Sequence, residues 1–123
     1  MSIQLWPIII GVHSIERFRL FYEKVFGFIA KEESPHYLAG HIWEAFVEIE
    51  EDSPHRLPYW AEGNIGTYKN SEFLVDDIEG FILKVTEYGG SILTPPRAMP
   101  WWGSNAEIGD IDNNIFLISQ KSL

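Results

Sequence analysis

This chain of 123 residues contains carboxylate and aromatic side chains that could bind a small molecule. Four candidates lie on expected strands, and the other two are adjacent tryptophans. They are Phe46, Glu48, Glu72, Glu107, Trp101 and Trp102. If these side chains converge, their cleft is acidic and aromatic, which favours a cationic, partly planar ligand through charge pairing and cation–π contact. The alternative is that the glutamates reach solvent at strand ends and the tryptophans fill the interior.

Glu48 is also the candidate for proton transfer. A carboxyl group held in a low-dielectric cleft has a raised pKa, and it could then act as a general base. The sequence identifies no acid or electrophile partner for it, so catalysis by Glu48 stays an alternative to binding alone.

Two other groups of polar residues have simpler interpretations. The oxygen-rich run Asp110–Asn114 lacks the spacing and the terminal Glu of a calcium loop, so it predicts a turn. The four histidines, His13, His36, His41 and His55, are expected at strand ends or in loops. The chain has no Cys, which excludes thiolate metal sites, Cys nucleophiles and disulfides.

The composition of the chain limits the classes of partner that it could bind. The net charge of −9 repels phosphate backbones, so we expect no nucleic-acid partner. No signal peptide or apolar run of membrane-spanning length is present, so we expect a cytoplasmic protein with no membrane partner. Hydrophobic residues make up 46% of the chain and charged residues 22%, as in an ordinary folded domain.

Alternating and helical patterns predict the elements that would position the candidates. Helices are expected after the N-caps Ser14 and Asp77, and they end at Gly27 and Gly89-Gly90. In the segment 42–50, Phe46 and Glu48 lie opposite a core face. That core face carries Trp43, Ala45, Val47 and Ile49. The predicted strands are Leu5–Val12, Phe28–Glu32, His36–Ala39, Ile42–Glu50, Thr67–Val75, Ser91–Thr94, Ser104–Gly109 and Ile115–Gln120.

The two halves of the chain repeat with an offset of 63 residues (75 − 12). This offset matches residues 12–30 with no gap, including a glutamate in the first helical turn and a glycine at the helix end. We therefore predict an α+β fold of two tandem βαβββ modules, with mixed sheets curved around a central cleft. The whole chain, 1–123, is one domain. Module one covers about 1–52, a linker about 53–66, and module two about 67–123.

Several motifs on this frame resemble those of one family. They are Phe21-Tyr22 before Val25–Phe28, Phe73–Ile78 before Tyr88–Gly90, and Pro95-Pro96, Met99–Trp101 and Asp110–Asn114 near the end. In this order and spacing the chain resembles the vicinal oxygen chelate superfamily, which holds glyoxalases, bleomycin-resistance proteins and extradiol dioxygenases. Ile111 and Asn113 replace the Pro and Gly of the last motif, and Asn tolerates the left-handed backbone of a turn.

The resemblance also implies where a metal site would lie. Family enzymes take ligands from the first and last strands of each module, and these positions fall on Pro7, Glu48, Asn70 and Leu117. A register one residue off would put Val47 in place of Glu48, but it would bury Glu48 against the helix. One carboxylate cannot hold a catalytic divalent ion, so we expect no metal and no cofactor. Asn70 and Leu117 join the expected ligand-binding set.

The favoured hypothesis is a metal-independent, antibiotic-resistance-like protein that binds a small molecule in its cleft. The resemblance implies a homodimer. One alternative is a lyase, isomerase or dioxygenase of the same superfamily, dependent on a divalent metal or using Glu48 as base. The other is a purely structural dimer module.

Overall fold

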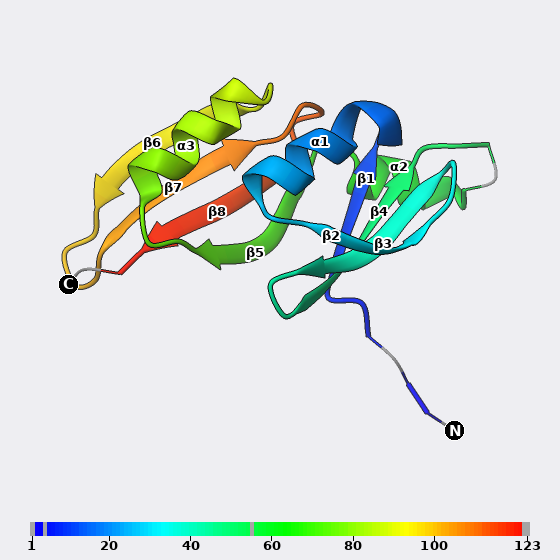
Figure 1. Ribbon diagram of the computed structural model, residues 1–123, viewed down its shortest axis with the longest axis horizontal. Helices are drawn as coiled ribbons and strands as arrows, with labels where there is room; N and C mark the ends of the chain where they lie inside the picture. The colour runs from blue at the N-terminus through cyan, green and yellow to red at the C-terminus, as the bar shows by residue number, and fades with distance from the viewer. Residues whose placement is uncertain (1, 4, 55, 122–123) are drawn as a thin grey trace.

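The computed structural model describes residues 2–3, 5–54 and 56–121, which form two four-stranded sheets that are not closed into a barrel (Figure 1). The first sheet has the order β1-β4-β3-β2, with β1 (Ile8–Val12), β2 (Ile29–Glu33), β3 (Tyr37–Ile42) and β4 (Ala45–Glu51). The second has the order β5-β8-β7-β6, with β5 (Tyr68–Leu74), β6 (Ser91–Ala98), β7 (Ser104–Gly109) and β8 (Ile115–Gln120). In each module the strand that comes first in the sequence pairs in parallel with the last one, β1 with β4 and β5 with β8. The other strand pairs are antiparallel. The predicted α+β fold of two βαβββ modules is confirmed.

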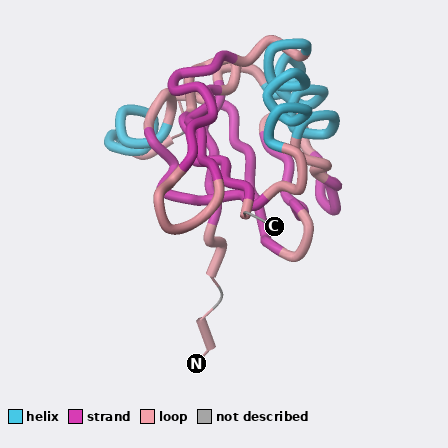
Figure 2. The backbone as a smooth tube through the Cα atoms, turned by 90° about the vertical axis from the view of Figure 1, so that its left-hand side faces the viewer, coloured by secondary structure: helices cyan, strands magenta, loops and turns pink. Residues whose placement is uncertain are grey.

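The helices α1 (Ile15–Val25) and α3 (Ile78–Glu87) begin at the predicted caps. The Ser14 side chain accepts a hydrogen bond from the Arg17 N–H, and Asp77 accepts one from the Gly80 N–H at 3.0 Å. Such caps satisfy backbone donors that the first helical turn leaves free. Both helices lie side by side on one side of the two sheets (Figure 2).

A third helix, α2 (Pro58–Asn64), lies in the predicted linker and was not expected from its prolines and glycines. It sits on the other side of the strands from α1 and α3 (Figure 2), against β1. A Cβ atom at Gly11 would lie 2.9 Å from side-chain atoms of both Trp60 and Asn64, so a larger residue there would push these side chains away from β1. The linker therefore covers one end of the first sheet.

One aromatic core connects the modules. Phe26, at the end of α1, has its ring centroid 4.9 Å from Phe73, 5.4 Å from Phe81 and 5.2 Å from Phe116. Those three rings belong to module two, so the first helix is packed on the second sheet. Such ring contacts add to the burial of apolar area. The two modules form one packed unit.

The turn between β7 and β8 provides a polar connection between the modules. Asn114 is fully buried, and its side-chain amide donates to the Gly11 carbonyl at 2.8 Å and accepts from the Gly66 N–H at 2.9 Å. Asp110 accepts a hydrogen bond from the buried Tyr22 hydroxyl at 2.5 Å. Burial raises the pKa of Asp110, against the opposing effect of these hydrogen bonds. The predicted turn is confirmed, with Asn113 at φ 64°, and its side chains are structural.

The strand predicted at Ile42–Glu50 is wrong at its start. Trp43 and Glu44 form the turn between β3 and β4, and Trp43 has φ 54° and is 86% exposed. The expected place of Trp43 on the core face is therefore incorrect. Alternation alone missed this turn because an apolar residue stands in it.

Candidate functional site

Each sheet packs one face against α1 and α3. The opposite face, which we call the open face, carries α2 at one end of the first sheet. On β4 the buried residues are Val47 and Ile49, and on β8 they are Phe116 and Ile118. These pairs are equivalent in the two modules, because Ile10 pairs with Ile49 and Phe73, 63 residues further on, pairs with Ile118. The register that places Glu48 on the open face is confirmed.

Three of the candidates are cross-strand neighbours on the open face of the second sheet. Leu117 on β8 lies between Glu72 on β5 and Glu107 on β7. The Glu72 carboxylate accepts a hydrogen bond from the Ser119 hydroxyl, and Glu107 accepts one from Thr94, both at 2.7 Å. The two carboxylates are therefore oriented by neighbouring hydroxyl groups.

The tryptophan pair lies beside this face, in the loop between β6 and β7. Trp101 is 79% exposed and Trp102 is half-buried, so the pair does not fill the core. A cavity of about 370 Å³, which we call the tryptophan pocket, is lined by Glu72, Met99, Trp101, Trp102, Asn105 and Ser119. Three of the sequence candidates thus come together in one cavity that carries indole rings, a carboxylate and an amide.

The sequence analysis missed Met99, Asn105 and Ser119 as parts of this pocket. Asn105 lies two residues before Glu107, and Ser119 lies two residues after Leu117. Because side chains on one face of a strand recur every second residue, extending the alternation would have found both. Met99 precedes the tryptophans in a loop, and no periodic pattern indicates it.

Asn70 lies at an irregularity in β5. Tyr68 pairs with Ile115 and Glu72 with Leu117, so three residues of β5 face one residue of β8. Asn70 has φ 56° and is exposed. Asparagine tolerates this left-handed conformation better than most residues do. Its membership of the ligand-binding set stays a prediction.

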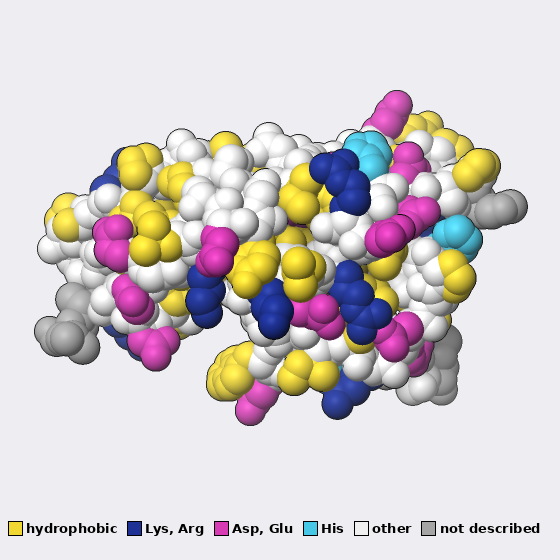
Figure 3. Space-filling model, turned by 45° about the horizontal axis from the view of Figure 1, so that its top comes forward, with side chains coloured by type: hydrophobic (Ala, Val, Ile, Leu, Met, Phe, Trp, Pro, Cys, Tyr) yellow, Lys and Arg dark blue, Asp and Glu magenta, His cyan; other side chains and the backbone are white. Residues whose placement is uncertain are grey.

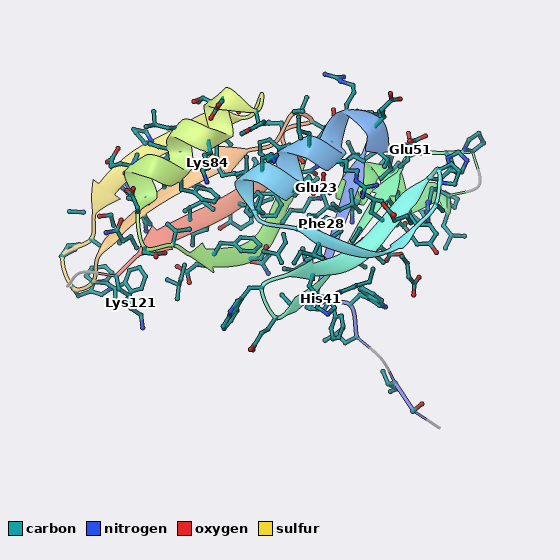
Figure 4. All side chains as sticks on the ribbon, viewed as in Figure 1. Glu23, Phe28, His41, Glu51, Lys84 and Lys121 are labelled. Carbon is teal, nitrogen blue, oxygen red and sulfur yellow. The ribbon has the colours of Figure 1, made fainter. Side chains whose placement is uncertain are left out.

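Phe46 and Glu48 lie on the open face of the first sheet, apart from the tryptophan pocket. The Phe46 ring is 4.7 Å from that of His41 and 5.5 Å from that of Trp6. His41, on β3, is labelled in Figure 4. Glu48 pairs with Ile9 on one side and with Ala39 on the other. The candidates therefore form two groups, one on each sheet.

Glu48 belongs to a charged cluster that the sequence analysis did not describe. Glu50, two residues along and buried, forms an ion pair with Arg56 at 2.6 Å, and Arg56 lies over the Trp60 ring at 4.9 Å. Desolvation, followed by a hydrogen bond and charge repulsion from Glu50, raises the pKa of Glu48 from 4.5 to about 7. Glu48 is thus close to half-protonated at neutral pH.

The pKa of Glu48 makes a prediction for stability. A carboxyl whose pKa is raised in the folded state stabilises the fold below pH 4.5, and this contribution is lost as the pH rises through about 7. Glu48→Gln removes this titration. Between pH 4.5 and pH 8 we therefore expect the free energy of unfolding of the variant to rise relative to that of the wild type by roughly 1 kcal/mol. Exposure to solvent keeps this figure small. Urea unfolding at both pH values measures it, with Glu44→Gln in the exposed turn as control. Equal pH dependence of Glu48→Gln and wild type would show that the carboxyl titrates normally.

The residues at the family's four metal-ligand positions do not fit a divalent ion. They are Pro7, Glu48, Asn70 and Leu117, which together offer one carboxylate and one amide. Catalytic metal sites need about three convergent protein ligands. Within residues 2–3, 5–54 and 56–121, no group of three or more His, Asp or Glu side chains could hold a metal ion.

The histidines do not supply a replacement site. His13 and His36 lie outside the strands, as predicted, and His36 contacts Glu51 at 3.6 Å. His41 is the next-to-last residue of β3, at a strand end as predicted, and it contacts Phe46. His55 lies outside the described residues.

The fold and the site define a class: a protein of paired βαβββ modules with open sheet faces that carry polar and aromatic side chains. The model of the Glyoxalase/Bleomycin resistance protein/Dioxygenase superfamily matches residues 4–117. The chain belongs to this superfamily. No curated protein sequence matches it.

Solved structures share the fold at low sequence identity. A glyoxalase/bleomycin resistance protein/dioxygenase family enzyme from Burkholderia phytofirmans PsJN is 20% identical with TM-score 0.74, over 92% of this chain and 94% of that one. The fosfomycin resistance protein FosX of Mesorhizobium loti is 21% identical with TM-score 0.69, over 100% and 96%. FosX of Listeria monocytogenes is 16% identical with TM-score 0.71, over 100% and 97%. No helix of the described residues is long and apolar enough to cross a membrane.

Proposed function

We propose that this protein binds a small organic cation in the tryptophan pocket and does so without a metal ion. The observation that carries the proposal is the pocket itself, in which Trp101, Trp102 and Glu72 line one cavity of about 370 Å³. Indole faces attract cations, and a carboxylate beside them adds charge pairing. The Asn105 amide adds a hydrogen-bonding group that could orient the ligand.

The names of several structural neighbours favour a role in resistance to a toxic small molecule. Three structures of similar fold are fosfomycin resistance proteins, and one of these, a mutant of the Listeria monocytogenes protein, was solved with Mn(II) and a phosphonic acid. The acidic pocket of this chain disfavours a phosphonate, because Glu72 would repel it. We therefore place the ligand among cations rather than anions. We also propose a homodimer, in which a second copy would cover exposed apolar residues such as Ile9, Phe46 and Leu74.

Ligand titration of two variants tests the proposal. We expect tetramethylammonium, the simplest organic cation, to bind the wild type in isothermal titration calorimetry. Glu72→Gln should weaken this binding about tenfold and Trp101→Ala about fivefold, from the loss of charge pairing and of one cation–π contact. Glu107→Gln, on the same face but outside the pocket, is the matched control. Unchanged affinity in both pocket variants would place the site elsewhere. A thermal-shift screen of cationic glycopeptides and small aromatic metabolites then searches for the natural ligand.

A second candidate function is proton transfer by Glu48, which one observation favours. A general base works best when its pKa is near the working pH, and the pKa of Glu48 is about 7. Glu50 and Arg56 would then set the charge around the base. This function would make the protein an enzyme of the same superfamily, and its site would lie on the first sheet.

A further inference from the structure

A second and larger cavity lies at the seam between the modules. Its volume is about 690 Å³, and apolar side chains from both modules line it, including Ile8, Phe26, Ala45, Phe73 and Phe81. We call it the seam cavity. In the space-filling view a notch indents one edge of the molecule, with hydrophobic side chains beside it (Figure 3). The cavity is of the size that binds drug-sized molecules.

The topology explains why this space is not filled. β1 and β5 are both edge strands, and each pairs on only one side. They are held close at one end by the Asn114 side chain, which donates to the Gly11 carbonyl in β1 and accepts from the Gly66 N–H just before β5. At the other end Ile8 and Leu74 both line the cavity. The distance between the two edge strands therefore increases from the Asn114 end toward Ile8 and Leu74. The aromatic core lies beside the space between them.

Glu72 connects this cavity to the tryptophan pocket, because it lines both. Its carboxylate is exposed and accepts the Ser119 hydrogen bond. Among the described residues the structure gives Glu72 no ion pair with Lys, Arg or His. A negative charge without a cationic partner thus stands between an aromatic pocket and an apolar cavity.

From this arrangement we propose that the ligand is an amphiphilic organic cation, whose charged head lies at Glu72 and the tryptophans and whose apolar part occupies the seam cavity. The inference rests on the proposed function, which concerns the head alone. A purely apolar molecule would leave Glu72 without a partner, and a small hydrated cation would leave the seam cavity unused. The exposed Trp43, which also lines the seam cavity, would contact the end of the apolar part.

A series of alkyltrimethylammonium ions tests the inference. Each methylene buried in an apolar site strengthens binding about fourfold. Hexyltrimethylammonium has five more methylenes than tetramethylammonium, so burial of only about half of them should tighten its binding to the wild type at least about thirtyfold, by titration calorimetry. Ala45→Phe places a ring in the seam cavity and should reduce this gain to about threefold or less. The affinity for tetramethylammonium should not change in this variant.

Leu83→Phe, on the exposed side of α3, is the matched control and should keep the full gain. Circular dichroism checks that Ala45→Phe folds, and Ala45→Leu serves if it does not. If tetramethylammonium binds but the longer chain brings no gain, or the gain survives in the Ala45 variant, the seam cavity is not part of the site. If tetramethylammonium itself does not bind, the proposed function also fails.

Discussion

Replacing Asn114 with Ala is expected to lower the free energy of unfolding by about 3–5 kcal/mol. The side chain is fully buried and makes three hydrogen bonds, to the Gly11 carbonyl, to the Gly66 N–H and to the Asp110 carboxylate. Alanine would remove one partner from each of two buried acceptors, the Gly11 carbonyl and the Asp110 carboxylate, and it would also remove the bond to the exposed Gly66. Gly11 belongs to module one and Gly66 to the linker. Loss of the Asn114 side chain therefore removes bonds that hold the β7–β8 turn of module two to both of them.

Urea unfolding followed by tryptophan fluorescence measures this effect. The neighbouring Asn113→Gly is the control, since Asn113 has φ 64°, a conformation that glycine adopts readily. We expect that variant to stay within about 0.5 kcal/mol of the wild type. A loss below 1 kcal/mol in Asn114→Ala would show that the modules are held together by the aromatic core alone.

Gly40→Ala is the second substitution with a large expected effect. A Cβ atom at Gly40 would lie 1.9 Å from the Ile29 carbonyl oxygen and 2.9 Å from the Ala30 Cα, both in the backbone of β2. Backbone cannot move aside as a flexible side chain can, so β2 and β3 must separate. We expect a loss of more than about 3 kcal/mol, or failure to fold.

Gly63→Ala is the matched control for this substitution. Gly63 lies in α2, where a Cβ atom would meet nothing within 4 Å. Alanine is favoured over glycine in helices by up to about 1 kcal/mol, so this variant should be at least as stable as the wild type. Thermal unfolding of the two variants compares them directly. Similar melting temperatures would contradict the close packing of β2 on β3.

The local patterns of the sequence were sufficient for most of the fold. The caps at Ser14 and Asp77, the strands β7 and β8, and the equivalence of Glu48 and Leu117 all follow from residue type and spacing. The short helix α2 could not be predicted, because its Gly63 and Pro58 are residues that local rules assign to loops. Its position depends on the space above Gly11, which only the tertiary structure reveals.

The candidate site was only partly predictable. Alternation places Glu72 and Glu107 on one face, because each strand has a period of two. It does not show that the loop carrying Trp101 and Trp102 folds back over Glu72, which depends on the path between two strands. The ion pair of Glu50 and Arg56 is also non-local, since Arg56 lies in the linker. Side chains on strands were therefore easier to place than those in loops.

The replacement of the family's metal ligands has a consequence for chemistry. A divalent ion in a superfamily enzyme polarises substrate oxygens, and Leu117 and Pro7 cannot hold one. Glu48 is the one carboxylate among the four ligand positions, and it lies on a different sheet from Glu72. In our proposal Glu72 binds a cationic ligand directly, in place of a metal.

The most direct test of this claim is to titrate tetramethylammonium into the wild-type protein after chelator treatment, and again after adding Mn²⁺, Ni²⁺ or Zn²⁺. We expect saturable binding with one site per chain and the same affinity in every sample. Binding that appears only when a divalent ion is restored, with the ion present in stoichiometric amount, would contradict the metal-independent site.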